Sequence, residues 1–394
     1  MAELQHENVK IINISVIKGK GLFARKNLKK GETIFEEKPL VSAQFSWNEL
    51  YKYLACEYCL KSLETAENMV RRLTNNAEIT LPYPECCDQD VTQFVNCPQC
   101  QIPYCSTECL DLALSQYHQV LCKGQSQEDE AHPLNRLLET WRSFHYPPET
   151  TSIMLIAKMI AMVKQAQDKG NIISLFSGFV KATLNEQEHI AHKLLGKQFQ
   201  VQREVLRQQL RETLFEEAVQ EWFTPEGFNS LLALIGTNGQ GMGSSSFSHW
   251  VKYTEKLCLG DAEKKQLDEL ITQLYDQLDE VSGEFLDCEG SALYLLQSSC
   301  NHSCSPNAEV TFPNGNHSLA MVALQDISPE EEITISYLSC CDLTRSRHSR
   351  QKILKENYLF TCTCEKCLSE ADDASVTSEE DIDSDEMDDE DTVI

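Results

Sequence analysis

The number and spacing of cysteines constrain this chain more than any other feature of its sequence. Of its 394 residues 18 are cysteine, and half of these lie in residues 56–122. Gaps of two residues let one turn present both sulfurs to a single ion, and gaps of three place two ligands one helical turn apart. The groups spaced in this way are Cys56, Cys59, Cys97, Cys100, Cys105, Cys109, His118 and Cys122. These eight groups suffice for two tetrahedral zinc ions, which we expect to be structural, since four protein ligands leave no position for water.

The rest of the chain alternates between strand-like and helical patterns. Residues 8–46 alternate apolar and polar side chains around glycines, which predicts short strands with tight turns. Helical periodicity follows over residues 133–222 and again over Ala262–Leu278. The glycine- and serine-rich run Gly236–Ser246 is expected to be a loop. Strand-like runs return at Leu319–Leu324 and Ile333–Tyr337.

One apolar stretch, Ile153–Val163, is the strongest candidate for a membrane segment. It is shorter than the roughly 20 residues that a bilayer requires, and it contains Lys158. The sequence therefore predicts a buried helix here, and no membrane partner.

Charge narrows the possible partners. The net charge is −27, and the segment from Ser369 onward holds 13 acidic residues with no lysine or arginine. Removing these 13 still leaves −14, which argues against direct nucleic-acid binding through a basic face. A basic protein partner is expected instead, because opposite fields accelerate encounter. The low apolar content of residues 369–394 predicts a disordered tail.

Four short motifs occur in a fixed order around the cysteine-rich segment. They are Lys18–Ala24 (KGKGLFA), Asn301–Asn307 (NHSCSPN), Glu331–Tyr337 (EEITISY) and Cys362-x-Cys364-x2-Cys367. Each alone has an ordinary interpretation, such as a polar loop, a core histidine or a tyrosine packed at a strand end. Together they resemble a SET domain. With a zinc finger inserted after the first strands, the chain resembles the SMYD family of SET- and MYND-domain protein-lysine methyltransferases, over roughly residues 8–368.

This resemblance implies how the metal ligands pair. In a cross-braced MYND finger, one ion takes Cys56, Cys59, Cys105 and Cys109, and the other takes Cys97, Cys100, His118 and Cys122. A third structural zinc would be held by Cys304, Cys362, Cys364 and Cys367. The interval between Cys59 and Cys97 contains 37 residues, which is more than is usual in the family. Cys86 and Cys87 lie within it. Either of these two could replace a ligand of the first ion.

The resemblance also implies S-adenosylmethionine as the cofactor. The implied cofactor contacts are Lys18, Gly19, Lys20, Gly21, Asn238, Asn301, His302, Tyr337, Tyr358 and Phe360. Glycine suits such a place because a missing side chain allows the backbone to approach a ligand closely. Tyr337 is the implied catalytic residue, beside the transferring methyl group in a lysine channel walled by Tyr358 and Phe360.

The chemistry of methyl transfer agrees with these residue types. Transfer from a sulfonium to an amine is an in-line displacement, so most of the catalysis is alignment of two bound reactants. The lysine must be uncharged, because an ammonium has no lone pair. An apolar, aromatic channel disfavours the charged form and so lowers the pKa of the lysine.

The expected fold is therefore of the α+β class, a SET-domain β-fold of small sheets with three additions. These are an inserted MYND zinc finger, a helical SET insert and a zinc-bound post-SET segment. The expected divisions are an N-terminal SET part at 1–55, the finger at 56–122, the insert at 123–235, the catalytic SET part at 236–340, the post-SET segment at 341–368 and the acidic tail at 369–394.

The implied substrate is a lysine of a basic protein, such as a histone or a ribosomal protein, and we expect a monomer in the cytoplasm, the nucleus or both. An alternative is a weakly active or inactive scaffold that recruits protein partners through the finger. A ubiquitin ligase built on the cross-braced module is a third. A nucleotide-binding loop at Gly236–Gly243 is rejected, because no apolar strand carrying an acidic residue follows it at the required distance.

One position departs from the family pattern. Glu330 stands before the acidic pair of the third motif, where the family usually has glycine. If this position needs a positive φ, the side chain costs about 1 kcal/mol.

Overall fold

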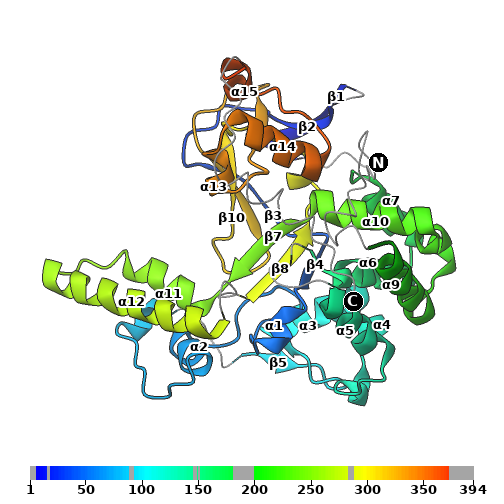
Figure 1. The fold of residues 1–394 in the computed structure, drawn as a ribbon, viewed down its shortest axis with the longest axis horizontal. Helices are drawn as coiled ribbons and strands as arrows, with labels where there is room; N and C mark the ends of the chain where they lie inside the picture. Colours follow the sequence, from blue (N-terminus) through cyan, green and yellow to red (C-terminus); the bar gives the residue numbers. More distant parts are fainter. Residues whose placement is uncertain are drawn as a thin grey trace, which may run out of the picture.

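The computed structural model describes residues 6–15, 18–87, 93–144, 149, 151–180, 199–282 and 288–371. Its strands form three small sheets and one two-stranded ribbon, and helices surround them on several sides (Figure 1). The predicted acidic tail lies outside the described residues from position 372 onward. Within the described residues, no helix combines the length and the apolar character that crossing a bilayer would require.

The first sheet brings three of the four sequence motifs together. Its strands, in spatial order, are β1 (Val9–Ser15), β2 (Gly19–Ala24), β12 (Glu332–Ile335) and β9 (Asn301–His302). The strand β12 pairs antiparallel with β2 on one side and parallel with β9 on the other. The glycine motif and the Asn-His motif therefore flank the strand that leads to Tyr337.

The other two sheets each join an early strand to late ones. One contains β10 (Ala308–Thr311), β11 (Leu319–Ala323) and β3 (Thr33–Glu37), and the other contains β4 (Val41–Gln44), β8 (Cys288–Leu293) and β7 (Gln240–Ser244). The predicted loop at Gly236–Ser246 is wrong, because β7 pairs with β8 along all five of its residues. Tertiary pairing overrides the weak strand preference of glycine here.

The helical segment beyond residue 130 forms one side of the molecule (Figure 1). Its helices are α5 (Pro133–Phe144), α6 (Ile153–Gln165), α7 (Lys169–Ser177), α9 (Phe199–Leu214), the 3-10 helix η4 (Glu217–Phe223) and α10 (Pro225–Asn238). The prediction of a buried helix is confirmed by α6, which is buried from Ile153 to Val163 apart from a partly buried Met154.

The finger and the residues on either side of it form short elements around the cysteines. These are α1 (Trp47–Leu50), α2 (Ala66–Leu73), η1 (Pro84–Cys86), β5 (Val95–Asn96), β6 (Pro103–Tyr104), α3 (Thr107–Ala113), the π-helical turn η2 (Leu114–His118), α4 (Gln119–Leu121) and η3 (Gly124–Ser126). In the long interval between Cys59 and Cys97, α2 packs against α11 (Ser246–Thr254) and α12 (Asp261–Ser282). Figure 1 shows these two helices projecting beside α2.

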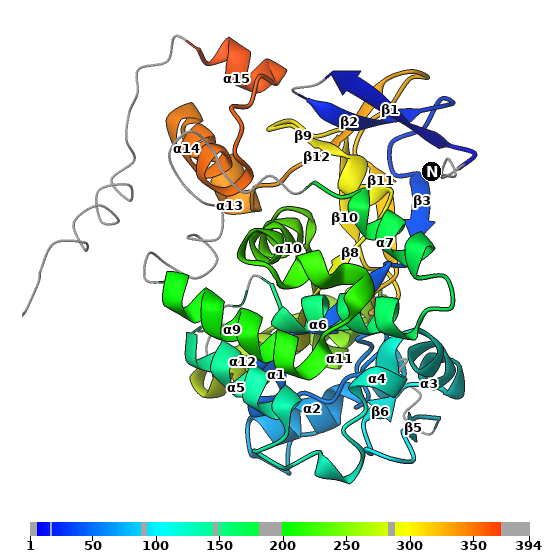
Figure 2. The ribbon, with the colours of Figure 1, turned by 90° about the vertical axis from the view of Figure 1, so that its right-hand side faces the viewer.

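The last three described helices lie beside the first sheet. They are α13 (Cys340–Leu343), α14 (Arg347–Tyr358) and α15 (Glu365–Ser369), and Figure 2 shows them beside the edge of the sheet that carries β9 and β12. The 3-10 helix η5 (Gln297–Ser299) directly precedes β9. The turn before β12 contains Glu330 at φ 66°. This position does have a positive φ, and the Glu330 carboxylate lies 2.6 Å from the ammonium of Lys10.

Candidate active site and metal centres

Tyr337 lies just beyond the end of β12, where two hydrogen bonds hold it. Its backbone N–H donates to Nδ1 of His302 at 3.0 Å, and its hydroxyl donates to the carbonyl oxygen of Cys300 at 2.7 Å. Parallel pairing of β12 with β9 sets Ile335 opposite His302 and so brings these groups together. Both the backbone and the phenol of Tyr337 are therefore oriented by the Asn-His segment.

The hydrogen bond to Tyr337 also assigns the tautomer of His302. Since Nδ1 accepts, a neutral imidazole carries its proton on Nε2. That nitrogen lies 3.3 Å from the Sγ of Cys304. His302 thus connects the tyrosine to a predicted zinc ligand.

Two more aromatic residues surround the Tyr337 ring. The rings of Tyr337 and Tyr358 have centroids 4.7 Å apart, and Phe360 meets Tyr337 edge-on at 6.2 Å. Leu359, between them, adopts a left-handed conformation at φ 63°, which ends α14 and lets its two neighbours flank Tyr337. The hydroxyl of Tyr358 donates to the carbonyl oxygen of Tyr337 at 3.3 Å.

Burial keeps the phenol of Tyr337 neutral. The pKa of Tyr337 is raised well above its ordinary value, mainly by loss of solvation and further by the nearby thiol of Cys300. Burial raises the pKa of Tyr358 in the same way. Both phenols therefore remain protonated well beyond neutral pH, and each donates to a backbone carbonyl.

Asn301 connects the glycine motif to β12. Its amide nitrogen donates to the carbonyl oxygen of Lys20 at 2.9 Å and to the carboxylate of Glu332 at 2.7 Å. The second carboxylate oxygen of Glu332 pairs with the ammonium of Lys18 at 2.8 Å. Within the described part of the chain, no donor reaches the amide oxygen of Asn301, which leaves an acceptor for a ligand. Sequence reasoning missed Glu332, although it lies in the acidic run of the third motif.

The two glycines of the first motif serve different needs. Gly19 has φ +70°, and no atom of the described residues lies within 4 Å of the place a Cβ would occupy. A Cβ on Gly21 would approach Ile14 to 2.6 Å and Glu332 to 3.0 Å. The first glycine leaves open space at the turn, and the second permits close packing of β1, β2 and β12.

Asn238 reaches the same region from the last residue of α10. Its amide donates to the carbonyl oxygen of Val180 at 3.0 Å, while the ammonium of Lys20 donates to that of Gly178 at 3.2 Å. Residues 178–180, directly after α7, therefore lie between two residues of the predicted cofactor site.

Three sets of four metal-binding side chains occur in the described residues. Within each set, the four ligand atoms all lie within 4.8 Å of one another. The sets are Cys56, Cys59, Cys105 and Cys109; Cys97, Cys100, His118 and Cys122; and Cys304, Cys362, Cys364 and Cys367. Sulfur and imidazole ligands in sets of four are those of structural zinc sites, so each set could hold one zinc ion.

The two further cysteines of the finger lie apart from these sets. Cys86 is buried in the apolar cluster around α2, α11 and α12. Cys87 accepts a hydrogen bond through its sulfur from the backbone N–H of Ala66 at 3.3 Å. The geometry gives neither of them a place in the first set.

Arg350 of α14, only 1% exposed, is a second group that sequence reasoning missed. Its guanidinium lies 3.4 Å from the sulfur of Cys304 and 3.7 Å from that of Cys367, and it pairs with Glu370 at 2.6 Å. Hydrogen bonds from Cys362, His302 and this guanidinium lower the pKa of Cys304. Within the third set, Cys304 is therefore the thiol that most readily becomes a thiolate.

Comparison with known proteins agrees with this geometry. A family model described as the SET domain matches residues 19–338. The human protein-lysine N-trimethyltransferase SMYD5 is 58% identical, over 95% of this chain and 89% of that protein. The protein of the same name from Danio rerio is 56% identical, over 93% and 88%. The chain belongs to the SMYD family. This SMYD protein is therefore a SET-class protein-lysine N-methyltransferase, and the prediction from its motifs is confirmed.

Two more distant proteins are also similar to this SMYD protein. The histone-lysine N-methyltransferase SET5 of Mycosarcoma maydis is 25% identical, over 90% of this chain and 66% of that protein. The crystal structure of the SET domain of LSMT bound to lysine and AdoHcy matches with a TM-score of 0.30 and 8% identity, over 92% of this chain and 54% of that one. A likeness as weak as the latter adds nothing to the assignment.

Proposed function

We propose that this SMYD protein methylates lysine side chains of basic proteins, with S-adenosylmethionine as the donor. The observation that carries the proposal is the position of Tyr337, whose backbone and hydroxyl are bound by His302 and Cys300 beside two further aromatic rings. When bound, the donor supplies the methyl group from its sulfonium. The residues of the chain align this methyl group with the lysine amine.

Different residues would bind the donor and the substrate lysine. Asn301 offers its amide oxygen to a donor group, and the open turn at Gly19 leaves room for a ligand against the backbone. Tyr337, Tyr358 and Phe360 form an aromatic enclosure that solvates a charge poorly, so a lysine entering it loses its proton more easily. The neutral Tyr337 hydroxyl can then orient the amine.

Charge supports the class of substrate. The net charge of −27 favours encounter with lysine-rich proteins, and we infer histones and ribosomal proteins as the class. The human and zebrafish relatives are named trimethyltransferases, and we propose transfer of up to three methyl groups here as well. We also propose that the protein acts as a monomer in the cytoplasm, the nucleus or both.

The test is methyl transfer by the zinc-loaded protein to core histones and to purified ribosomal proteins. Mass spectrometry of the products identifies the modified lysine and counts its methyl groups. Binding of S-adenosylmethionine, measured by calorimetry, should be present in the wild type and lost in Asn301→Ala. Absence of both binding and transfer from a correctly folded, zinc-loaded protein would refute the proposal.

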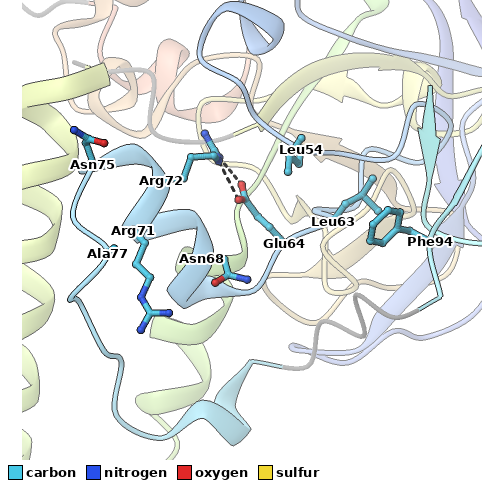
Figure 3. A pocket seen from close by; sticks show the side chains of 9 residues that line it. All are labelled: Leu54, Leu63, Glu64, Asn68, Arg71, Arg72, Asn75, Ala77 and Phe94. Carbon is cyan, nitrogen blue, oxygen red and sulfur yellow. Dashed lines mark hydrogen bonds and ion pairs between the residues drawn. The ribbon is translucent and has the colours of Figure 1, made fainter. Parts of the chain in front are cut away.

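A second proposed function is recruitment of a protein partner by the finger. A cavity of about 570 Å³ lies over α2, and Figure 3 shows Leu54, Leu63 and Phe94 on one side of it and Arg71, Ala77 and Asn75 on the other. Leu54 and Phe94 are 47% and 45% exposed, although both are large and apolar. The ion pair of Glu64 with Arg72 lies at its centre (Figure 3).

This cavity is remote from the candidate active site. In both Figure 1 and Figure 2, α2 lies at the opposite end of the molecule from α14. A Leu54→Ser/Phe94→Ser variant should therefore keep methyl transfer to a short peptide while losing capture of a protein partner. Equal loss of both activities would argue against a separate recruiting surface.

A further inference from the structure

Two adjacent cysteines of α13, Cys340 and Cys341, have no part in the reaction proposed above. Both side chains are exposed, and among the 18 cysteines of the chain only Cys258 shares that property. Successive residues of a helix point about 100° apart around its axis, so neighbouring side chains usually diverge. Here the two sulfurs instead lie 3.9 Å apart on the surface.

This separation suits two sulfurs that share one ion. A tetrahedral ion with sulfur bonds of about 2.3 Å holds its ligands about 3.8 Å apart, and a pyramidal trivalent centre with similar bonds needs them only a few tenths of an ångström closer. Asp342, the nearest acidic residue in the sequence, is already engaged, since its carboxylate accepts from the Ser339 hydroxyl at 2.7 Å and pairs with Arg345 at 3.2 Å. The pair therefore offers two sulfur ligands and no carboxylate.

A disulfide between the two cysteines is disfavoured by their covalent geometry. Consecutive Cα atoms across a trans peptide are about 3.8 Å apart, whereas disulfides usually span about 4.4–6.8 Å. Such a bond would be strained and easily reduced. It would also distort α13, whose first turn is capped by the Ser339 hydroxyl accepting from the N–H of Asp342 at 3.0 Å.

The protonation of the pair favours a ligand that takes up two thiols. The hydrogen bond and charge of Cys340 raise the pKa of Cys341, so the two sulfurs do not readily become thiolates together. Arsenoxides react with neutral dithiols and release water, and therefore avoid this cost.

We propose that Cys340 and Cys341 form a surface site that binds a trivalent arsenical covalently through both sulfurs. An arsenoxide, R–As=O, forms two As–S bonds with the two thiols. Its oxygen leaves as water with the two thiol protons, and arsenic stays trivalent, so no oxidant or reductant is required. The site lies three residues beyond Tyr337 and uses none of the residues of methyl transfer, so it does not rest on the proposed function.

The test uses phenylarsine oxide with the full-length, zinc-loaded protein. Native mass spectrometry should show one tightly bound phenylarsine, with the zinc content unchanged and the adduct removed by dimercaptopropanol. Cys340→Ser and Cys341→Ser should each weaken binding about 100-fold, because a single thiol loses the effective concentration of the second. Cys258→Ser is the matched control, as it removes an exposed but solitary cysteine and should leave binding unchanged.

Three results would overturn the proposal. The first is equal binding by the wild type and both variants. The second is binding that releases zinc, which would place the arsenical on the metal clusters. The third is loss of two hydrogens from the wild type without an adduct, which would show a disulfide. Thermal melting of the two variants within about 1 °C of the wild type would confirm that these surface changes leave the fold intact.

Discussion

Lys158 lies almost wholly inside the protein, with its ammonium 2.8 Å from a carboxylate oxygen of Glu57. The lysine side chain is 1% exposed, and the ammonium also lies over the ring of Tyr117 at 4.7 Å. It donates further to the carbonyl oxygen of Ser42 at 3.0 Å. Because Glu57 follows the predicted zinc ligand Cys56 directly, this ion pair ties the helical insert to the finger and to β4.

Replacing this lysine should destabilise the whole protein. Lys158→Met leaves Glu57 without its cation in a largely buried place, and we expect a loss of about 3 kcal/mol in the free energy of unfolding. Urea denaturation measures it. Lys164→Met, on the exposed face of the same helix, is the control and should cost less than about 0.5 kcal/mol. Equal losses of unfolding free energy in the two variants would show that the buried ion pair does not contribute specifically to stability.

Removing the phenolic hydroxyl should separate catalysis from binding. Tyr337→Phe is expected to lower kcat by about 100-fold while leaving affinity for the donor nearly unchanged, because the hydroxyl acts on the reacting amine. The lost bond to the Cys300 carbonyl costs about 1 kcal/mol of stability. Tyr358→Phe, whose hydroxyl bonds only the Tyr337 carbonyl at 3.3 Å among the described residues, should reduce kcat far less. An unchanged kcat in Tyr337→Phe would remove this residue from the mechanism.

The rate should rise with pH and show no decline from ionisation of the phenol. Burial holds the pKa of Tyr337 above its ordinary value, so the hydroxyl stays protonated throughout the working range. The substrate amine must lose its proton, and kcat/KM should therefore increase from about pH 7 toward about pH 10. Donor binding across the same range controls for unfolding. A falling limb that disappears in Tyr337→Phe would contradict this assignment.

Loss of the third metal set should weaken donor binding. Cys364→Ser should release one zinc ion and reduce affinity for S-adenosylmethionine about tenfold, or about 1.4 kcal/mol, since Cys304 lies two residues from His302. Cys122→Ser also removes a ligand but lies in the finger, so it should leave donor affinity unchanged. Calorimetry with parallel zinc analysis distinguishes the two. Equal affinities in both variants would mean that the third set is not coupled to the site.

The acidic tail should affect encounter rather than folding. Deleting residues 371–394 removes 12 acidic residues, and we expect slower methylation of basic proteins at low ionic strength with an unchanged melting temperature. At about 0.5 M salt, screening should make the two forms equal. A difference that persists at high salt would point to a direct contact instead of steering.

The spacing of the cysteines predicted their grouping because a metal site is largely local. Pairs such as Cys97 and Cys100 approach one ion through a single turn, whatever the rest of the chain does. The family resemblance then implied which of these pairs, distant in the sequence, share one ion. The resemblance likewise implied that Asn301, His302 and Tyr337 share one cofactor site, and the parallel pairing of β12 and β9 brings these residues together.

The rest depends on contacts between segments far apart in the sequence. The strand at Gln240–Ser244 has little strand preference of its own and forms because β8 pairs with it. Glu332 and Arg350 gained their roles from partners that only the fold places beside them, namely Asn301 and Cys304. No local pattern distinguishes them from other charged residues on a strand or a helix.

The third metal set also orders events during synthesis. Cys304 must wait for Cys367, 63 residues later in the chain, before its four-sulfur cluster can close. The first two sets are complete once residue 122 has emerged, so the finger can take up zinc early. From residue 122 to the last thiol at residue 367 there are 245 residues, which take the ribosome about 12–49 s at about 5–20 residues per second. A nascent chain would therefore carry a finished finger for some time before it could hold a methyl donor.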